Sequence, residues 1–181
     1  MIILGVDPGT LLTGYAVIES NHHKPRIIAS NVIKISSANE LPVRLKQIYD
    51  TLINVIDKYE PDELAIETAF YSKNVQSTLK LGHARGVSIL AAVNKKIPAV
   101  EYSPREIKKS VVGNGNASKE QVKFMVCQIL KMKTSPENSG FDVFDAAAVA
   151  LCHHNRIFSG NSNSYKTWKD FIRDNPSRVR K

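Results

Sequence analysis

The segment MIILGVDPGTLLTGYAVIES, residues 1–20, decides the fold class of this chain. Residues 1–7 and 13–20 are two short runs rich in β-branched residues, and the Pro-Gly pair between them is typical of a tight turn. A third run, residues 26–35, follows the polar segment NHHKP. We therefore predict three antiparallel strands at the amino terminus, with Asp7 at the end of the first.

From residue 41 the apolar pattern changes its period. Apolar residues recur every three or four positions over residues 41–59, which predicts an amphipathic helix. Short buried strands are predicted at residues 61–68 and 99–103, on either side of a helix over residues 77–96. Strands that are first adjacent and then separated by helices indicate an α/β fold with a mixed five-stranded sheet, antiparallel at one edge, parallel in the remainder and flanked by helices.

Further helices are expected in the last third of the chain. Ser103 with Glu106, and Ser118 with Gln121, each form the pattern of a capping box at a helix start. A final helix begins near Ser139, and its apolar pattern ends before Phe158. We expect one domain over residues 1–157 and a basic, flexible tail over residues 158–181.

Composition narrows the class of partner. The chain of 181 residues has 25 Lys and Arg against 17 Asp and Glu, a formal net charge of +8, which favours a polyanion such as nucleic acid. Cys127 and Cys152 lie in apolar helical patterns and are interpreted as buried hydrophobic residues in a reducing compartment. The amino terminus has the pattern of neither a signal peptide nor a membrane span, so we expect a cytoplasmic protein with no membrane partner.

Acidic residues occur at the ends of predicted elements. Asp7 and Glu67 each end a strand, and Asp142 and Asp145 lie three residues apart on the last helix. If the two strands are parallel neighbours, all four carboxylates can face one crevice at the carboxyl end of the sheet. Their mutual repulsion would be relieved by a divalent cation, and ligation by oxygen alone suits Mg²⁺ or Mn²⁺. Two such ions can align the hydrolysis of a phosphodiester.

Each acidic residue also has a purely structural interpretation. Asp142 could close a capping box with Ser139, Glu67 could be an exposed strand end, and Asp7 could open the Asp-Pro-Gly turn. Each residue alone favours the structural interpretation. Taken together in a basic chain, the four favour the catalytic one.

Other residues leave alternatives open. Phe70 and Tyr71 could stack on unpaired bases or pack inward. Lys108, Lys109 and Lys119 flank the loop VVGNGNAS and could contact phosphate or form a solvated face. His153 and His154 point apart on a helix, which favours packing at the surface or core edge over a shared metal.

Four long segments resemble the RuvC-type bacterial Holliday junction resolvases. They are ILGVDPGTLLTGYAVI, LAIETAFYSKNVQSTLKLGHARGVSILAAVN, EYSPREIKKSVVGNGNASKEQVKFMV and FDVFDAAAVALCH, and the similarity runs from about Ile2 to His154. The resemblance implies an RNase H-like fold and paired, Mg²⁺-dependent nicking of four-way DNA junctions in recombination and repair. Mn²⁺ is expected to substitute, with one or two ions in each active site.

The resemblance also implies roles for particular residues and partners. It assigns catalysis and metal binding to Asp7, Glu67, Asp142 and Asp145, and DNA contacts to Phe70, Lys108 and Lys119, beside which we also expect Tyr71 and Lys109. It implies a homodimer and a branch-migration helicase complex as partners. The dimer interface would involve the glycine-containing helix, at Leu81, Gly82, Ala84, Arg85 and Gly86.

Two other functions compete with this one. The segment GVDPGT with TGYAV also resembles the phosphate-binding hairpin of actin-like and sugar-kinase ATPases, but 181 residues leave no room for their second domain. A protein that binds junctions without cleaving them is the other alternative, and the complete set of four acidic residues argues against it.

Overall fold

The computed structural model describes residues 1–21, 24–68, 75–132 and 140–159. Its centre is one five-stranded sheet in the order β3-β2-β1-β4-β5. The strands are β1 (Ile2–Asp7), β2 (Leu12–Glu19), β3 (Arg26–Lys34), β4 (Glu63–Glu67) and β5 (Ala99–Tyr102). The pairs β1–β2 and β2–β3 are antiparallel, whereas β1–β4 and β4–β5 are parallel. The mixed sheet predicted from the sequence is confirmed.

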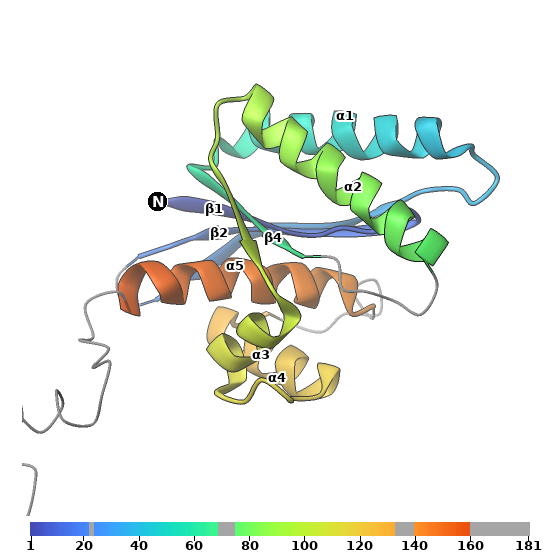
Figure 1. Cartoon of the computed structure of the whole chain (residues 1–181). Helices are drawn as coiled ribbons and strands as arrows, with labels where there is room; N and C mark the ends of the chain where they lie inside the picture. The colour runs from blue at the N-terminus through green and yellow to red at the C-terminus, as the bar shows by residue number, and fades with distance from the viewer. Residues whose placement is uncertain (22–23, 69–74, 133–139, 160–181) are drawn as a thin grey trace, which may run out of the picture.

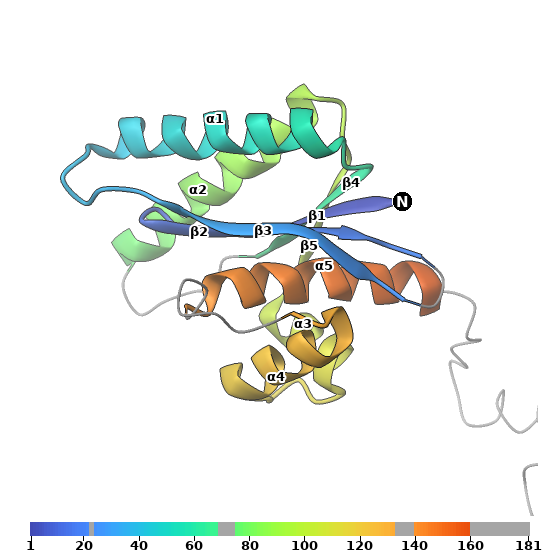
Figure 2. The ribbon, with the colours of Figure 1, turned by 180° about the vertical axis from the view of Figure 1, so that it is seen from behind.

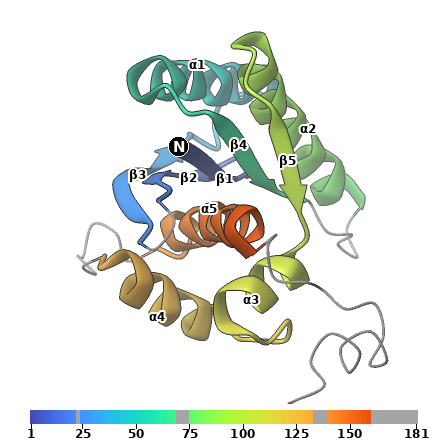
Figure 3. The same ribbon diagram turned by 90° about the vertical axis from the view of Figure 1, so that its left-hand side faces the viewer.

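Helices cover both faces of this sheet (Figure 1). The helices α1 (Leu41–Tyr59) and α2 (Val75–Asn94) lie on one face, and α5 (Asp142–Ser159) lies on the other. The short helices α3 (Pro104–Val112) and α4 (Lys119–Leu130) pack against α5 on its side away from the sheet, as the end-on view of α5 in Figure 3 shows. The view from behind in Figure 2 shows β3 as one edge of the sheet, running between α1 and α5.

The central strand β1 is apolar along its length because both of its faces are covered. Leu4 and Val6 belong to the core cluster under α1 and α2, whereas Ile3 belongs to the cluster around α5. Side chains alternate along a strand, so Asp7 is in phase with Ile3 and faces the α5 side. This alternation directs the acidic end of β1 toward the helix that carries Asp142 and Asp145.

Two glycines allow α5 to lie unusually close to the sheet. A Cβ atom at Gly5 would lie 2.3 Å from the carbonyl oxygen of Ala146, and one at Gly14 would lie 2.0 Å from that of Asp142. The facing helix is rich in alanine, and its residues from Ala146 to Ala150 are fully buried. The first turn of α5 therefore rests directly on β1 and β2.

The helix ends follow the sequence signals closely. Both predicted capping boxes are present, at Ser103 with Glu106 and at Ser118 with Gln121. The helix α5 continues to Ser159, past the predicted domain boundary at residue 157, and residues 160–181 lie outside the described residues. None of the helices in the described part of the chain is long and apolar enough to cross a membrane.

Candidate active site

Asp7 and Glu67 lie side by side at the carboxyl end of the sheet. Their strands are parallel neighbours in which Val6 pairs with Ile66, so the two acidic residues come next in register. Both line a cavity of about 210 Å³ that also contains Asp145, Lys108 and Lys119. The prediction that β1 and β4 open on the same side is confirmed.

The same two acidic residues also line a second hollow, of about 290 Å³. Its other walls come from the turn after β1, from Thr68 after β4, from Leu81 on α2 and from Asp142. Asp7, Glu67 and Pro104 line both hollows, so the two are adjoining parts of one crevice. The sequence pattern predicted that the four carboxylates gather at this end of the sheet, and the charges of Glu67, Asp145 and Asp142 all act on Asp7.

The turn that follows Asp7 is held by Thr13. The hydroxyl of this fully buried residue donates to the carbonyl of Gly9 at 2.6 Å and accepts from the Gly9 N–H at 3.2 Å. Gly14 pairs with Asp7 in the antiparallel register. Sequence reasoning missed Thr13 and Gly14, although a Thr-Gly pair just after the turn was a usable signal.

Burial and mutual repulsion perturb the acidic residues. Burial first, and then the charges of Glu67, Asp145 and Asp142, raise the pKa of Asp7 to about 8. Burial and the charge of Asp145 raise the pKa of Glu67 to about 7. The pKa of Asp145 is also raised, chiefly by burial. The carboxylates are thus close enough to oppose one another's ionisation.

Lys119 partly offsets this repulsion. Its ammonium group donates to Asp145 at 3.1 Å, and the Asp145 side chain is only 17% exposed. Partial burial acts to lower the pKa of Lys119, but Asp145, Asp7 and Glu67 together hold that pKa above its usual value. A cation is therefore favoured at this position among the carboxylates.

The donor set fits a hard divalent cation. The acidic side chains offer carboxylate oxygens, which Mg²⁺ and Mn²⁺ accept. Such an ion would relieve the mutual repulsion that adds to burial in raising the pKa values of Asp7 and Glu67. Within the described ranges, no three His, Cys, Asp or Glu side chains meet closely enough to enclose an ion in this arrangement.

Comparison with known proteins identifies the family. The family model described as "Crossover junction endodeoxyribonuclease RuvC" matches residues 3–153. The chain belongs to the RuvC family. RuvC of Salinibacter ruber is 46% identical over 179 residues, which cover 99% of each chain, and RuvC of Porphyromonas gingivalis is 43% identical over 183 residues, which cover 99% of this chain and 97% of the relative.

Solved RuvC structures have the same fold. RuvC of Thermus thermophilus matches with a TM-score of 0.79 at 30% identity, covering 88% of this chain and 97% of its own. The same protein in complex with Holliday junction substrate matches with a TM-score of 0.81 at 30% identity, covering 88% and 96%. The RNase H-like fold is therefore confirmed, and membership of the RuvC family argues against the actin-like ATPase alternative.

The residues predicted to contact DNA in this RuvC-family chain lie in different places. Lys108 and Lys119 both line the cavity that contains Asp7. Lys109 is on the other side of α3, in a separate hollow with Tyr102 and Arg156. Phe70 and Tyr71 lie outside the described residues.

The residues predicted for the dimer interface also separate. Ala84 is fully buried in its own chain, Leu81 lines the second hollow, and Arg85 forms an ion pair with Glu101 of β5. Gly82 and Gly86 are exposed, and a Cβ atom at either would meet nothing within 4 Å. Of the five residues predicted for the interface, only Gly82 and Gly86 are exposed.

His153 and His154 lie deeper than the sequence suggested. They are 3% and 6% exposed, and each contacts a different residue of the sheet region. His153 contacts Tyr102 of β5, whereas Nδ1 of His154 lies 2.7 Å from the hydroxyl of Ser20, just after β2. The prediction that the two rings do not share a ligand agrees with these separate partners.

Proposed function

We propose that this chain resolves four-way DNA junctions as a structure-selective endonuclease, by paired, divalent-metal-dependent hydrolysis of phosphodiester bonds. The observation that carries the proposal is the pair Asp7 and Glu67 at the junction of two hollows, flanked by Asp142, Asp145 and two lysines. Membership of the RuvC family and the Thermus thermophilus relative solved with Holliday junction substrate support the choice of DNA substrate.

The four acidic residues would act as catalytic residues and metal ligands. Mg²⁺ is the natural choice, Mn²⁺ should substitute, and one or two ions would bind in each active site. The chemistry that a bound ion supplies is charge neutralisation at the phosphate and activation of water. Asp7 and Glu67, with pKa values near 8 and 7, must lose their protons before they can ligate the ion.

The lysines would place the DNA backbone. Lys119 already lies against Asp145, and Lys108 lines the same cavity, so their ammonium groups can hold a phosphate beside the carboxylates. Lys109 would contact the backbone farther away, on the other side of α3. Phe70 and Tyr71 are proposed to stack on bases unpaired at the crossover.

Paired cleavage requires two active sites, and α2 offers a surface for a homodimer. Val75, Leu79, Leu90 and Val93 are 51–70% exposed and recur with the spacing of one helix face. Gly82 and Gly86 lie at the same spacing and would let a second helix approach closely. We call the six residues the α2 stripe.

Two further parts of the proposal rest on the family alone. A branch-migration helicase complex would act on the same four-way junction as a partner of this nuclease. The cytoplasm would be the site of action, because the DNA substrate lies there in bacteria.

The deciding experiment is cleavage of a synthetic four-way junction labelled on each strand in turn. With Mg²⁺ we expect paired nicks on two strands of like polarity, and no cleavage when Mg²⁺ is replaced by EDTA. Linear duplex of the same sequence is the control and should stay intact. Tight junction binding without nicks would favour the binding-only alternative instead.

A further inference from the structure

A chain of polar contacts crosses the apolar core between α5 and the sheet. The hydroxyl of Tyr102 and Nδ1 of His153 are 2.7 Å apart, and both residues are only 3% exposed. On the other side of the ring, a carboxylate oxygen of Glu63 lies 2.8 Å from Nε2. The Nε2–H finds no well-aligned hydrogen-bond acceptor, so the Glu63 contact is a close polar approach and not a straight hydrogen bond.

The surroundings of His153 determine the protonation and the tautomer of its ring. Burial lowers the pKa of His153 below its ordinary value, which favours neutral imidazole. With its proton on Nε2, facing Glu63, the ring leaves Nδ1 to accept the hydrogen bond from Tyr102. The hydroxyl of Tyr102 thus donates to Nδ1 of His153, and a side-chain hydrogen bond with Arg156 also acts on it.

Such contacts are costly among apolar neighbours. Tyr102 belongs to the core cluster around α5, where an apolar pair would fill the space without desolvating a carboxylate, an imidazole and a phenol. The proposed cleavage chemistry uses none of these three groups. Their place in the fold indicates another use.

The main chain of Tyr102 connects this chain of contacts to the catalytic cavity. Its carbonyl accepts from the Thr68 N–H at 2.8 Å and from the Thr68 hydroxyl at 3.3 Å. Thr68 directly follows Glu67, which pairs with Tyr102 in the parallel register. The backbone of Tyr102 therefore binds the residue after β4, while the side chain of Tyr102 is held by His153.

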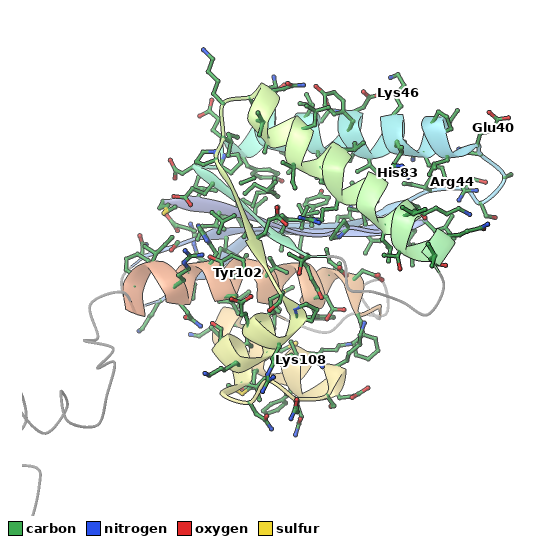
Figure 4. The ribbon with its side chains drawn as sticks, viewed as in Figure 1. Glu40, Arg44, Lys46, His83, Tyr102 and Lys108 are labelled. Carbon is green, nitrogen blue, oxygen red and sulfur yellow. The ribbon has the colours of Figure 1, made fainter. Side chains whose placement is uncertain are left out.

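Tyr102 also lies at the start of α3. The next residue, Ser103, caps that helix, and Pro104 and Lys108 of α3 line the catalytic cavity. Figure 4 labels Tyr102 beside the ribbon of α5 and Lys108 on α3. The guanidinium of Arg156 lies 5.8 Å from the centre of the Tyr102 ring and covers it.

We propose that His153 is a positioning residue for the catalytic site: by fixing Tyr102, it sets the position of Glu67 at the end of β4 and of Lys108 on α3. The inference rests on the proposed function of Glu67 as a metal ligand. It predicts that the buried contact between His153 and Tyr102 affects metal affinity, although His153 itself lies outside the catalytic cavity.

The test compares full-length variants by Mn²⁺ binding without DNA, measured by isothermal titration calorimetry. Tyr102→Phe removes one hydroxyl and keeps the ring, and His153→Leu removes both contacts. We expect both to weaken Mn²⁺ binding about tenfold, the usual effect of losing a group that orients a metal ligand. Junction binding without divalent ions should stay unchanged.

His154→Leu is the matched control. His154 is the next residue on the same helix, is similarly buried, and uses the same ring nitrogen at the same distance, but toward Ser20 at the opposite end of the sheet. It should lower the melting temperature like His153→Leu and leave Mn²⁺ affinity unchanged. His153→Asn, which keeps a polar group near Nδ1, should recover part of the affinity.

Equal Mn²⁺ affinities in all variants would overturn the inference, as would equal losses in His153→Leu and His154→Leu. If His153→Leu does not fold, Tyr102→Phe decides the matter, because it keeps the ring in the core. A wild-type protein that neither binds Mn²⁺ nor cleaves junctions would overturn the proposed function. A wild-type protein that does both, beside unaffected variants, would overturn only the role of His153.

Discussion

At the scale of single residues, Asp7 combines burial with crowding by like charges. Its pKa of about 8 is raised by burial first, and then by the three other carboxylates. Such a perturbation is typical of a site that needs an external cation or proton to be stable. Two predictions follow from the same side chain.

Asp7→Asn should reduce junction cleavage by more than about 100-fold, because it removes a proposed metal ligand that lines both hollows. Junction binding should be unchanged or stronger, since one negative charge facing the phosphate is lost. Gel cleavage and binding assays on one preparation measure both effects. Asp50→Asn, at an exposed position of α1 that pairs with Lys46, is the control and should cleave normally.

Stability should depend on pH in a direction set by these raised pKa values. Folded Asp7 and Glu67, at about 8 and 7, keep protons that the unfolded chain has lost above its ordinary values of 3.8 and 4.5. The stability present at low pH is therefore lost as pH rises from about 4 to about 8. In metal-free buffer at pH 8, Asp7→Asn should be more stable than wild type by about 1 kcal/mol or more.

Thermal unfolding at pH 5 and pH 8, with and without Mg²⁺, measures this effect. Mg²⁺ should raise the melting temperature of the wild type at pH 8 and raise that of Asp7→Asn much less. A wild-type protein that becomes more stable between pH 5 and pH 8 without metal would contradict the predicted repulsion.

At the scale of elements, the close contact between α5 and the sheet determines where Asp142 and Asp145 lie. Gly14 faces the backbone of Asp142 itself, so any side chain there must move the first turn of α5. The small residues of α5 and the glycines of β1 and β2 thus form one matched surface.

Gly14→Ala should therefore damage the active site without touching an acidic residue. A Cβ atom 2.0 Å from the Asp142 carbonyl forces α5 outward, which should cost about 1–3 kcal/mol of stability. Cleavage per folded molecule should fall more than tenfold, because a displacement near 1 Å can cost about 100-fold in rate. Chemical denaturation and single-turnover cleavage provide the two measurements, and normal cleavage by a folded variant would contradict this role.

At the scale of the whole molecule, the helices form two layers, one on each side of the sheet. The helices α5, α3 and α4 lie on one side of the sheet, whereas α1 and α2 cover the other (Figure 1). The residues of the α2 stripe are exposed on α2. The proposed dimer surface is thus carried by the helix whose Leu81 also lines the second hollow of the active site.

Gly86→Leu should weaken the proposed dimer without unfolding the chain. The added side chain meets nothing within its own chain but fills the space that a second helix would occupy. Sedimentation velocity should show more monomer at equal concentration, with an unchanged or higher melting temperature for the monomer. Lys80→Leu, at an exposed position on another side of α2, is the control; equal dimerisation of both variants would contradict the interface.

Salt should weaken junction binding steeply, because the chain carries a net charge of +8 and each neutralised phosphate contributes about −0.9 to the log–log slope. Lys108→Ala should reduce the magnitude of that slope by about 1. Lys46→Ala, on α1 in the opposite layer, should leave it unchanged; both lysines are labelled in Figure 4. Fluorescence anisotropy at several salt concentrations measures the slopes, and equal slopes for the two variants would argue against a DNA contact at Lys108.

Part of the candidate site could be predicted from short-range patterns. The positions of Asp7 and Glu67 at strand ends follow from apolar runs and the Pro-Gly turn, and the starts of α3 and α4 follow from Ser103 and Ser118. These features depend on residues within a few positions of one another. Their physical causes, side-chain alternation and the unsatisfied N–H groups of a helix start, are present in any segment with that pattern.

The sequence by itself therefore determined the mixed sheet, the starts of α3 and α4, and the four acidic residues that we propose for catalysis. Only the tertiary structure decided how the two aspartates of α5 sit against Asp7 and Glu67, and that His153 holds Tyr102. These facts depend on how closely α5 approaches strands that lie more than 100 residues earlier in the chain, at Gly5 and Gly14. Local periodicity shows which face of a helix is buried, but the distance and angle at which two surfaces meet are determined by the packing of both.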